Sequence, residues 1–465
     1  MKLTLFRYLA VFLVWPLAAI AQTNFTILKS FTGAPDGAVP YCSLVCDTNG
    51  MFYGTTLVGG ISNQGTVFML SHNGVGYTGA GYDILKNFFG TNGIEPFAGL
   101  VLGSDGNLYG TTYSGGTSNL GTVFKINRDD SGFAVLHSFI GGSDGENPEA
   151  GLIEGSDGAL YGTTYFANSS NRGTVFKINK DGSGYSVLHI FTGYPGDGQQ
   201  PTGRLLQGSD GALYGTTLFG GSYGAGTVFT LNKDGSGYGV LYNFGASGDG
   251  AGPIAGLIEG SDHALYGTTQ LGGGTGYQGT VFKINKDGSG YQILHRFSTT
   301  GNDGQTPNGE LMEGSDGALY GGTANGGVNG GGTIYKLNKD GSGYTILRSF
   351  FGTGGDGQSP KCALLQLSNG VFYGTTELGS ANGAGCVFAL STSPLPPQIV
   401  SLSASGASNF LQFAGTSLVQ YDVQRSTNLS SWSVLTTLTS QTNGQFNYLD
   451  LNPPQPSAFY RLQQH

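Results

Sequence analysis

Residues 148–191 read PEAGLIEGSDGALYGTTYFANSSNRGTVFKINKDGSGYSVLHIF, and this stretch decides the fold because its pattern recurs seven times. A repeat of about 50 residues made of short strands and turns is typical of a β-propeller blade. The sequence therefore predicts an all-β fold with seven blades. The Tyr-Gly-Thr-Thr core, which reads Tyr-Gly-Gly-Thr in the sixth copy, recurs every 52 to 56 residues and begins at Tyr53, Tyr109, Tyr161, Tyr214, Tyr266, Tyr320 and Tyr373.

Each repeat contains four apolar segments, which in the quoted copy are AGLIEG, ALYGTT, GTVFKIN and YSVLHIF. A Ser-Asp-Gly turn separates the first two segments, a Gly-rich loop the next two, and a KDGSG turn the last two. Asp-Gly between apolar runs is a strong hairpin signal, because both central residues tolerate positive φ. We expect each repeat to fold as a four-stranded antiparallel meander.

The two ends of the repeat array predict how the ring closes. The last copy of the third segment begins at Gly385 and has no fourth segment after it, whereas an extra fourth segment, FTILKSF at residues 25–31, precedes the first full repeat. We expect this N-terminal strand to complete the seventh blade, which leaves no unpaired closing edge. An open solenoid, the alternative architecture, would not need the displaced strand.

These motifs closely resemble the GloVer tandem repeat, a family of exported bacterial proteins with signatures of the YGTT…GG…GTVFKI…DGSGY..L..F kind. The resemblance covers about residues 25–391 and is specific, because several motif blocks recur in one order seven times. It implies an exported protein of the cell surface. The resemblance supplies no catalytic residues.

The segments outside the repeats predict export and a second domain. Residues 1–21 combine a basic start, an apolar run and the ending Ala19-Ile20-Ala21, which is the layout of a signal peptide cleaved after Ala21. A membrane anchor is the alternative, although the run is shorter than the roughly 20 residues of a span. The propeller is expected over residues 22–391 and a Pro-rich linker over 392–398.

Residues 399–465 alternate apolar and polar positions and predict a small β-sandwich-like domain. Their YDVQRSTNLSSWSVLTT…FNYLD…FYRL pattern resembles the fibronectin-like modules of exported bacterial proteins. The segment is shorter than a full sandwich of about 100 residues. The resemblance implies a role in sorting or attachment.

Charge and composition limit the classes of partner. The formal net charge is -9 with only 20 basic residues, which argues against a nucleic-acid partner. No later stretch is long and apolar enough to span a membrane. We expect a secreted or cell-surface monomer whose candidate partners are a carbohydrate or another surface protein.

An acid or its amide stands four residues before the proline that precedes each first strand. These side chains should lie on the propeller face that carries the loops between blades. A ring of carboxylates suits a hard cation such as calcium, but each residue also begins an Asp-Gly type of turn and could serve the loop alone. The seven positions are Asp36, Asn92, Asp144, Asp197, Asp249, Asp303 and Asp356.

Positions that differ between the repeats are more informative about function than positions that recur in all seven, because folding explains a feature that every repeat shares. The first and third residues after that proline vary between repeats, as expected of side chains at the mouth of a central channel. Aromatics flanked by acids suit a carbohydrate ligand, and two carboxylates about 5 to 10 Å apart could hydrolyse one. A solvated channel lining without a ligand is the alternative. The candidate residues are Tyr41, Phe97, Glu149, Arg204, Glu310 and Lys361.

Three histidines and two cysteines complete the candidate residues. His137, His189 and His295 share one position of the fourth strand, where other repeats have lysine, tyrosine or arginine, so we expect an exposed position and no metal site. Cys42 and Cys362 share one first-strand position in blades that ring closure makes neighbours. We predict a disulfide between them in an oxidising compartment.

The sequence leaves three functions open. The leading interpretation is a non-catalytic binding or scaffolding module, with carbohydrate as the candidate ligand. A secreted carbohydrate-active hydrolase or lyase with acids at the channel mouth is the second, and a purely structural surface protein is the third. Fold alone does not choose among them, because propellers host binding and catalysis alike.

Overall fold

The computed structural model describes residues 24–41, 43–71, 81–167, 172–274, 276, 278–352, 355–392, 398–405, 408–414, 420–428, 430–439, 445–454 and 458–464. The signal-peptide prediction and most of the predicted linker lie outside these residues. Contacts divide the chain into a repeat unit, Phe25–Ser391, and a C-terminal unit that begins at Thr392. Among the described residues no helix is long and apolar enough to cross a membrane.

The repeat unit is all-β and is built mainly from seven four-stranded antiparallel sheets, which we number 1 to 7. Sheet 1 contains β3 (Val45–Cys46), β4 (Met51–Thr56), β6 (Thr66–Ser71) and β7 (Tyr82–Asn87); sheet 2 contains β8 (Val101–Leu102), β9 (Leu108–Thr112), β10 (Thr122–Ile126) and β11 (Ala134–Ser138); sheet 3 contains β12 (Ile153–Glu154), β13 (Leu160–Thr164), β14 (Thr174–Ile178) and β15 (Ser186–Ile190); sheet 4 contains β17 (Leu206–Gln207), β18 (Leu213–Thr217), β20 (Thr227–Leu231) and β21 (Gly239–Asn243).

The later sheets repeat this order, and the last one recruits the N-terminal strand. Sheet 5 contains β23 (Ile258–Glu259), β24 (Leu265–Thr269), β26 (Thr280–Ile284) and β27 (Gln292–Arg296); sheet 6 contains β29 (Met312–Glu313), β30 (Leu319–Thr323), β32 (Thr333–Leu337) and β33 (Thr345–Ser349); sheet 7 contains β35 (Leu365–Gln366), β36 (Phe372–Thr376), β38 (Cys386–Ser391) and β1 (Asn24–Ser30), with β1 hydrogen-bonded beside β38.

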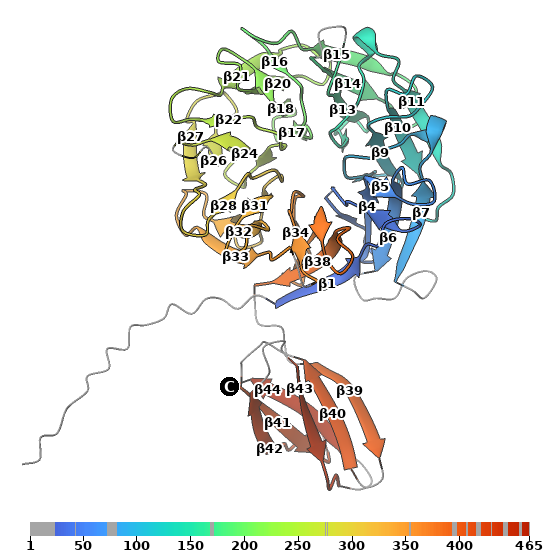
Figure 1. The fold of residues 1–465 in the computed structure, drawn as a ribbon, viewed down its shortest axis with the longest axis vertical. Helices are drawn as coiled ribbons and strands as arrows, with labels where there is room; N and C mark the ends of the chain where they lie inside the picture. Colours follow the sequence, from blue (N-terminus) through green and yellow to red (C-terminus); the bar gives the residue numbers. More distant parts are fainter. Residues whose placement is uncertain are drawn as a thin grey trace, which may run out of the picture. The chain divides into compact units, whose positions relative to one another are not determined.

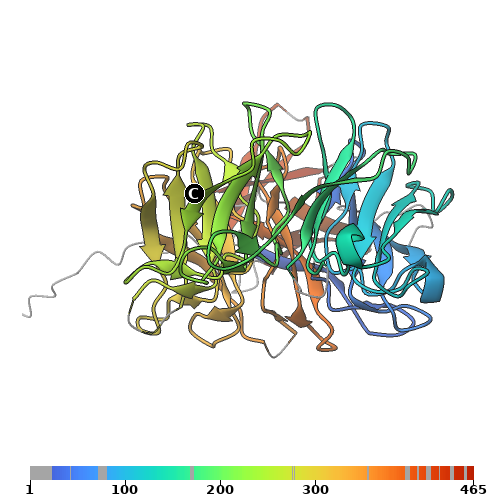
Figure 2. The ribbon, with the colours of Figure 1, turned by 90° about the horizontal axis from the view of Figure 1, so that it is seen from above.

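The sheets of the repeat unit stand around a common centre in a propeller-like arrangement (Figure 1). The fourth strands, such as β21, β27 and β33, lie on the outside, and β17 lies toward the centre. Figure 2 shows strands that run from one face of the unit to the other, with loops gathered on both faces. Residues on the loops of one face can therefore meet although they are far apart in the sequence.

Short β-pairings connect two loops of each repeat on one face of the repeat unit. The loop before a first strand pairs with the loop after the second strand of the same repeat. Five of these pairings are two-stranded ribbons: β2 (Gly37–Ala38) with β5 (Val58–Gly59), β16 (Gly198–Gln199) with β19 (Phe219–Gly220), β22 (Gly250–Ala251) with β25 (Leu271–Gly272), β28 (Gly304–Gln305) with β31 (Asn325–Gly326), and β34 (Gly357–Gln358) with β37 (Leu378–Gly379). Single bridges replace the ribbon in repeats 2 and 3, beside the 3-10 turns η1 (Gly90–Asn92) and η2 (Gly142–Asp144).

Apolar residues of neighbouring sheets share seven buried clusters. One cluster joins Tyr161 and Val175 of sheet 3, and Phe191 directly after it, to Leu213 and Phe229 of sheet 4. Another joins sheet 7 to sheet 1, where the N-terminal segment contributes Phe31. Every second strand is buried along its whole length. Each sheet is thus stabilised on both faces by its neighbours, through apolar area removed from water.

A cationic or aromatic side chain near the end of each outer strand also covers the ring of an aromatic residue at, or directly before, the start of the next outer strand. The histidines that we expected to be exposed take part in these contacts, and they are only 18% to 20% exposed. The position is therefore a packing site between sheets, not a solvated one. The seven pairs, with separations of 3.6 to 4.3 Å, are Lys29–Tyr82, Lys86–Phe133, His137–Tyr185, His189–Tyr238, Tyr242–Tyr291, His295–Tyr344 and Arg348–Phe25.

The C-terminal unit consists of two three-stranded sheets. Leu411, Phe413, Tyr421, Val423 and Phe446 form its buried core and come from both sheets. The C-terminal unit is thus all-β, as the alternating sequence predicted. The sheets are β39 (Gln398–Ser405) with β40 (Ser408–Ala414) and β43 (Gln445–Asp450), and β42 (Ser433–Thr439) with β41 (Gln420–Ser426) and β44 (Phe459–Gln464).

The glycine of the Tyr-Gly-Thr-Thr motif is required by close packing across the sheet. Gly162 lies opposite Phe176, and a Cβ atom on Gly162 would stand 2.6 Å from Phe176 Cζ. We expect Gly162→Ala to lower the free energy of unfolding by about 1 to 3 kcal/mol, because the ring must move within a packed interface. Urea unfolding of the variant and the parent, followed by far-UV circular dichroism, measures this difference in free energy.

Gly239→Ala in β21 is the matched control, because a Cβ atom there would meet nothing within 4 Å. That variant should be neutral or slightly stabilised, since alanine restricts the unfolded chain more than glycine does. Equal destabilisation of the two variants would contradict the packing explanation.

Candidate functional site

The six residues predicted to surround a channel mouth line one cavity. Its volume is about 650 Å³, and its walls come from all seven repeats. Tyr41, Phe97, Glu149 and Lys361 follow the prolines that open their repeats, and Arg204 and Glu310 lie two positions further along theirs. The volume falls in the range of about 300 to 1,000 Å³ that is usual for small-molecule sites.

Aromatic rings cover one side of this cavity. Tyr41 and Phe97 meet edge to face with ring centroids 5.6 Å apart, and Phe97 also contacts the ring of Tyr113 at 5.4 Å. Tyr165 lines the cavity as well. The aromatic side chains come from repeats 1 to 3, so the cavity has one aromatic wall and a more polar remainder.

Tyr113 and Tyr165 were missed by the sequence reasoning. Both directly follow a Tyr-Gly-Thr-Thr motif, at a position that holds Leu57, Leu218 and Glu377 in other repeats. Variation at this position was a usable signal, because it breaks the sevenfold pattern in the same way as the residues after the proline. What the sequence did not reveal is that both variable positions face the same mouth.

Glu149 stands beside the aromatic wall without a counter-charge. It has no hydrogen-bond or ion-pair partner among the residues that the structure describes. Burial raises the pKa of its carboxyl to about 7. Burial also raises the pKa of the Tyr113 and Tyr165 hydroxyls, and the nearby Glu149 charge adds to both shifts. Glu149 is therefore available to a ligand, as an acid or as a hydrogen-bond acceptor.

The two cations of the cavity are neutralised by other acids. Arg204 Nη2 lies 3.0 Å from Glu310 Oε1, so this ion pair joins repeat 4 to repeat 6. Lys361 Nζ lies 2.8 Å from Glu377 Oε2 and 4.8 Å from the ring centroid of Tyr41. With Glu310 bound to arginine, the two glutamates predicted at the mouth have different surroundings although they share one cavity.

A second polar group in the wall also lacks a partner. The side-chain oxygen Oδ1 of Asn308 is buried and accepts no hydrogen bond from the described residues. A buried acceptor without a donor is costly, and ligands commonly satisfy such groups. The cavity thus offers two free acceptors, Glu149 and Asn308, together with an aromatic wall.

The seven acidic or amide residues proposed as a calcium ring bind parts of the protein instead of one another. In repeat 4, Asp197 Oδ2 accepts the Thr192 backbone N–H at 2.7 Å and lies 3.2 Å from His189 Nε2. Asp36, Asp144, Asp303 and Asp356 each contact the basic side chain of a fourth strand in a similar way. Asn92 and Asp249 bind the backbone N–H groups of Phe89 and Gly245.

These contacts are those expected of residues that fix a turn. Within the described part of the chain, no group of three or more His, Cys, Asp or Glu side chains could hold a metal ion. Calcium binding by this ring stays a prediction, and the turn role accounts for the contacts that the residues make.

The predicted Cys42–Cys362 disulfide lies partly outside the described residues, because Cys42 is not among them. Cys362 is buried, and its Sγ atom lies 3.0 Å from the Thr375 backbone nitrogen. The disulfide stays a prediction.

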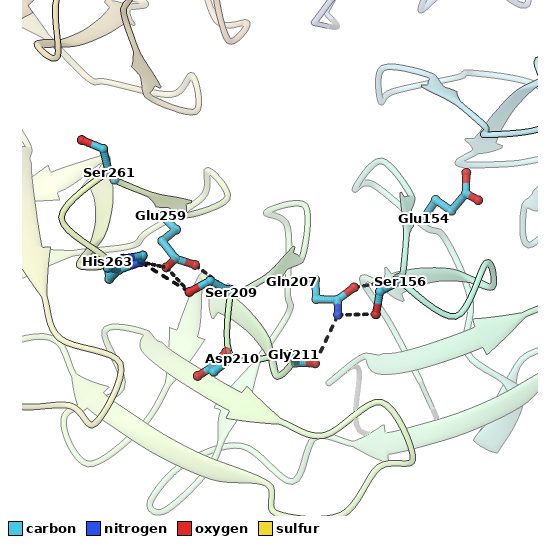
Figure 3. Close-up of a pocket in the computed structure, with 11 residues that line it drawn as sticks. Glu154, Ser156, Gln207, Ser209, Asp210, Gly211, Glu259, Ser261 and His263 are labelled. Carbon is cyan, nitrogen blue, oxygen red and sulfur yellow. Dashed lines mark hydrogen bonds and ion pairs between the residues drawn. The ribbon is translucent and has the colours of Figure 1, made fainter.

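A second, more open pocket of about 830 Å³ is lined by the turns between the first and second strands of repeats 3 to 5, which read Ser-Asp-Gly in repeats 3 and 4 and Ser-Asp-His in repeat 5 (Figure 3). Its polar groups are bound to one another: Glu259 accepts both the backbone N–H and the hydroxyl of Ser209, at 2.7 and 2.6 Å, and Lys286 Nζ lies 2.6 Å from the same carboxylate. Partial burial alone would raise the pKa of Glu259, but these bonds outweigh it and lower the pKa to about 2.

His263 adds no catalytic arrangement to this pocket. Its Nδ1 atom faces both Glu259, at 3.0 Å, and Ser209, at 3.5 Å, and the Ser209 hydroxyl already donates to Glu259. A histidine acting as a base between serine and acid would use its two nitrogens separately. Equivalent contacts recur between Ser104 and Glu154, so the pocket is a junction between repeats.

Comparison with protein families identifies the repeat. The model of the family described as the Gloeobacter/Verrucomicrobia repeat matches residues 14–207 and 200–420. The chain belongs to this family. The resemblance inferred from the repeat motifs is thereby confirmed. A search of curated proteins finds no match.

Solved structures of similar fold share little sequence with this family member. An extracellular domain described as part of a hybrid two-component system from B. thetaiotaomicron aligns with a TM-score of 0.53 at 11% identity, over 95% of this chain and 56% of that one. Oligogalacturonate lyase from Vibrio parahaemolyticus gives 0.52 at 12%, over 79% and 93%. The GH74 xyloglucanase from Xanthomonas campestris gives 0.53 at 12%, over 84% and 59%. The chain spans little more than half of the first of these, and the likeness is one of fold.

The raised pKa of Glu149 predicts how the free energy of unfolding depends on pH. Between about pH 4.3, where a glutamate of the unfolded chain titrates, and pH 7, the folded protein binds the extra proton, so rising pH removes stability across this window. We expect Glu149→Gln to raise the free energy of unfolding by about 1 to 2 kcal/mol at pH 8, after allowance for solvent screening, and to change it little at pH 4.

Denaturant unfolding at both pH values measures the effect, and Glu146→Gln in the same loop is the control. A difference between Glu149→Gln and the parent that is equal at pH 4 and pH 8 would contradict an unpaired, desolvated carboxyl.

Proposed function

We propose that this chain is an exported seven-bladed β-propeller, closed by β1 and followed by a small fibronectin-like domain, which binds carbohydrate in the cavity at the mouth of its channel. Seven sheets, seven shared apolar clusters and the pairing of β1 with β38 support the blade number and the closure. The signal-peptide pattern of residues 1–21 supports export.

The observation that carries the binding function is an aromatic wall in the same cavity as two acceptors without partners among the described residues. Aromatic faces cover the apolar C–H faces of a sugar ring, and the hydroxyls of the sugar can donate to Glu149 and to Asn308 Oδ1. The cations Arg204 and Lys361 are already paired, so the cavity has no surplus positive charge for a highly acidic ligand. A neutral or weakly acidic glycan fits this chemistry best.

A glycan array probed with the mature chain, residues 22–465, tests the proposal. We expect the chain to bind a restricted set of the glycans. The Phe97→Ala variant should bind them about tenfold or more weakly, because one face of the sugar loses its contact. Val328→Ala, an exposed apolar residue of another loop, is the control. Addition of a calcium chelator tests the predicted Asp ring in the same experiment.

Absence of binding to every glycan would contradict the proposal and favour a purely structural surface protein or a protein partner. A monomeric state, which we also propose, is checked by sedimentation of the same preparation.

A carbohydrate-active hydrolase or lyase is the second candidate, favoured by Glu149 itself. A carboxyl with a pKa of about 7 is suited to give or take a proton near neutral pH, and Glu310 supplies a second carboxylate in the same cavity. Under this function Glu149→Gln should abolish product release from a bound glycan while binding is retained. If the parent chain binds a glycan without turnover, the catalytic function is contradicted and carbohydrate binding remains as the proposed function.

A further inference from the structure

Three exposed aromatic side chains surround the β16–β19 ribbon of repeat 4. Tyr194 precedes β16, Phe219 lies in β19, and Tyr223 follows it, with exposed fractions of 62%, 44% and 62%. The ribbon places these loops side by side: Phe219 pairs with Gln199, and the Gly221 N–H donates to the Asp197 carbonyl at 2.7 Å. We call the three residues the aromatic track.

The aromatic track departs from the repeat pattern. Tyr223 stands where five other repeats have serine or asparagine, and Tyr194 stands where the similar loop of the first repeat has Ala34. The departures occur at different offsets yet fall on loops of one sheet. Side chains needed only for folding would recur in every repeat, so their concentration here points to a ligand. Large exposed apolar groups gathered in one place commonly mark interaction sites.

The track is continuous with the cavity. Leu218, the residue directly before Phe219, lines the cavity wall. Within residues 192–200 and 218–226 only Asp197 is charged at neutral pH, and it is already bound by His189 and Thr192. One cation from outside these ranges, Arg172, donates to the Thr192 carbonyl beside the track. A nucleic acid or an anionic membrane would require cations, which these loops lack. Glycine, hydroxyl and aromatic groups suit a neutral glycan.

We propose that the ligand is an extended oligosaccharide or polysaccharide, with one part in the cavity and the following sugar units stacked along Phe219, Tyr194 and Tyr223. This inference rests on carbohydrate binding by the cavity. It adds that the site recognises chain length, because a short fragment fills the cavity and a longer one also reaches the track.

The test compares long and short probes. Affinity electrophoresis of the mature chain in gels containing xyloglucan, hydroxyethylcellulose, polygalacturonate or dextran identifies the polymer that is bound. Calorimetry then compares a tetrasaccharide and an octasaccharide of that polymer. We expect the octasaccharide to bind at least tenfold more tightly. The double variant Tyr194→Ala and Tyr223→Ala should lose this advantage and keep the parent's affinity for the tetrasaccharide.

A matched control changes two exposed apolar residues of other loops, Ile61→Ala and Phe351→Ala, and should leave both affinities unchanged. The proposed role of the aromatic track would be contradicted if the parent bound the two fragments equally well. It would also be contradicted if the Tyr194 and Tyr223 double variant kept the full affinity for the octasaccharide. Neither result would contradict binding in the cavity. Failure of the parent chain to bind any of the four polymers or their fragments would overturn the carbohydrate function itself, and the track with it.

Discussion

The fold depends on the burial of both faces of every four-stranded sheet. A single repeat has two apolar faces and no residues with which to cover them, so it gains stability only between two neighbours. The second strands show this most clearly, because residues such as Tyr161 are fully buried within the sheet interfaces. The small size of Gly162 then follows as a condition of that burial, because a ring from the next strand occupies the space over it.

Much of this fold was readable from the sequence because its determinants are local. The Asp-Gly turns set the hairpins, and the displaced segment at residues 25–31 predicted the pairing that β1 makes with β38. The role of His137, His189 and His295 was misjudged, because a residue that is exposed on its own sheet can be covered by the next one. The stacking of His189 on Tyr238 depends on the rotation between sheets, which no local motif encodes.

The sequence predicted part of the cavity lining but not its chemistry. Variation against a sevenfold background brought out six residues that do share one cavity. Which of them are free could not be foreseen, because Arg204 reaches Glu310 across two repeats whereas Glu149 reaches no cation. The two glutamates differ because the fold brings an arginine of another repeat to Glu310 and no cation to Glu149. Their positions in the sequence do not predict these contacts.

The placement of β1 in the last sheet bears on how such chains diversify by recombination. The mismatch of one strand between the start and the end of the array is the same whatever the number of repeats in between. Unequal crossing-over within the coding sequence, at equivalent points of two repeats, would therefore add or remove a whole unit and still provide complementary ends. Variation in copy number would change the width of the central channel, and with it the size of the ligand, without any new closing element.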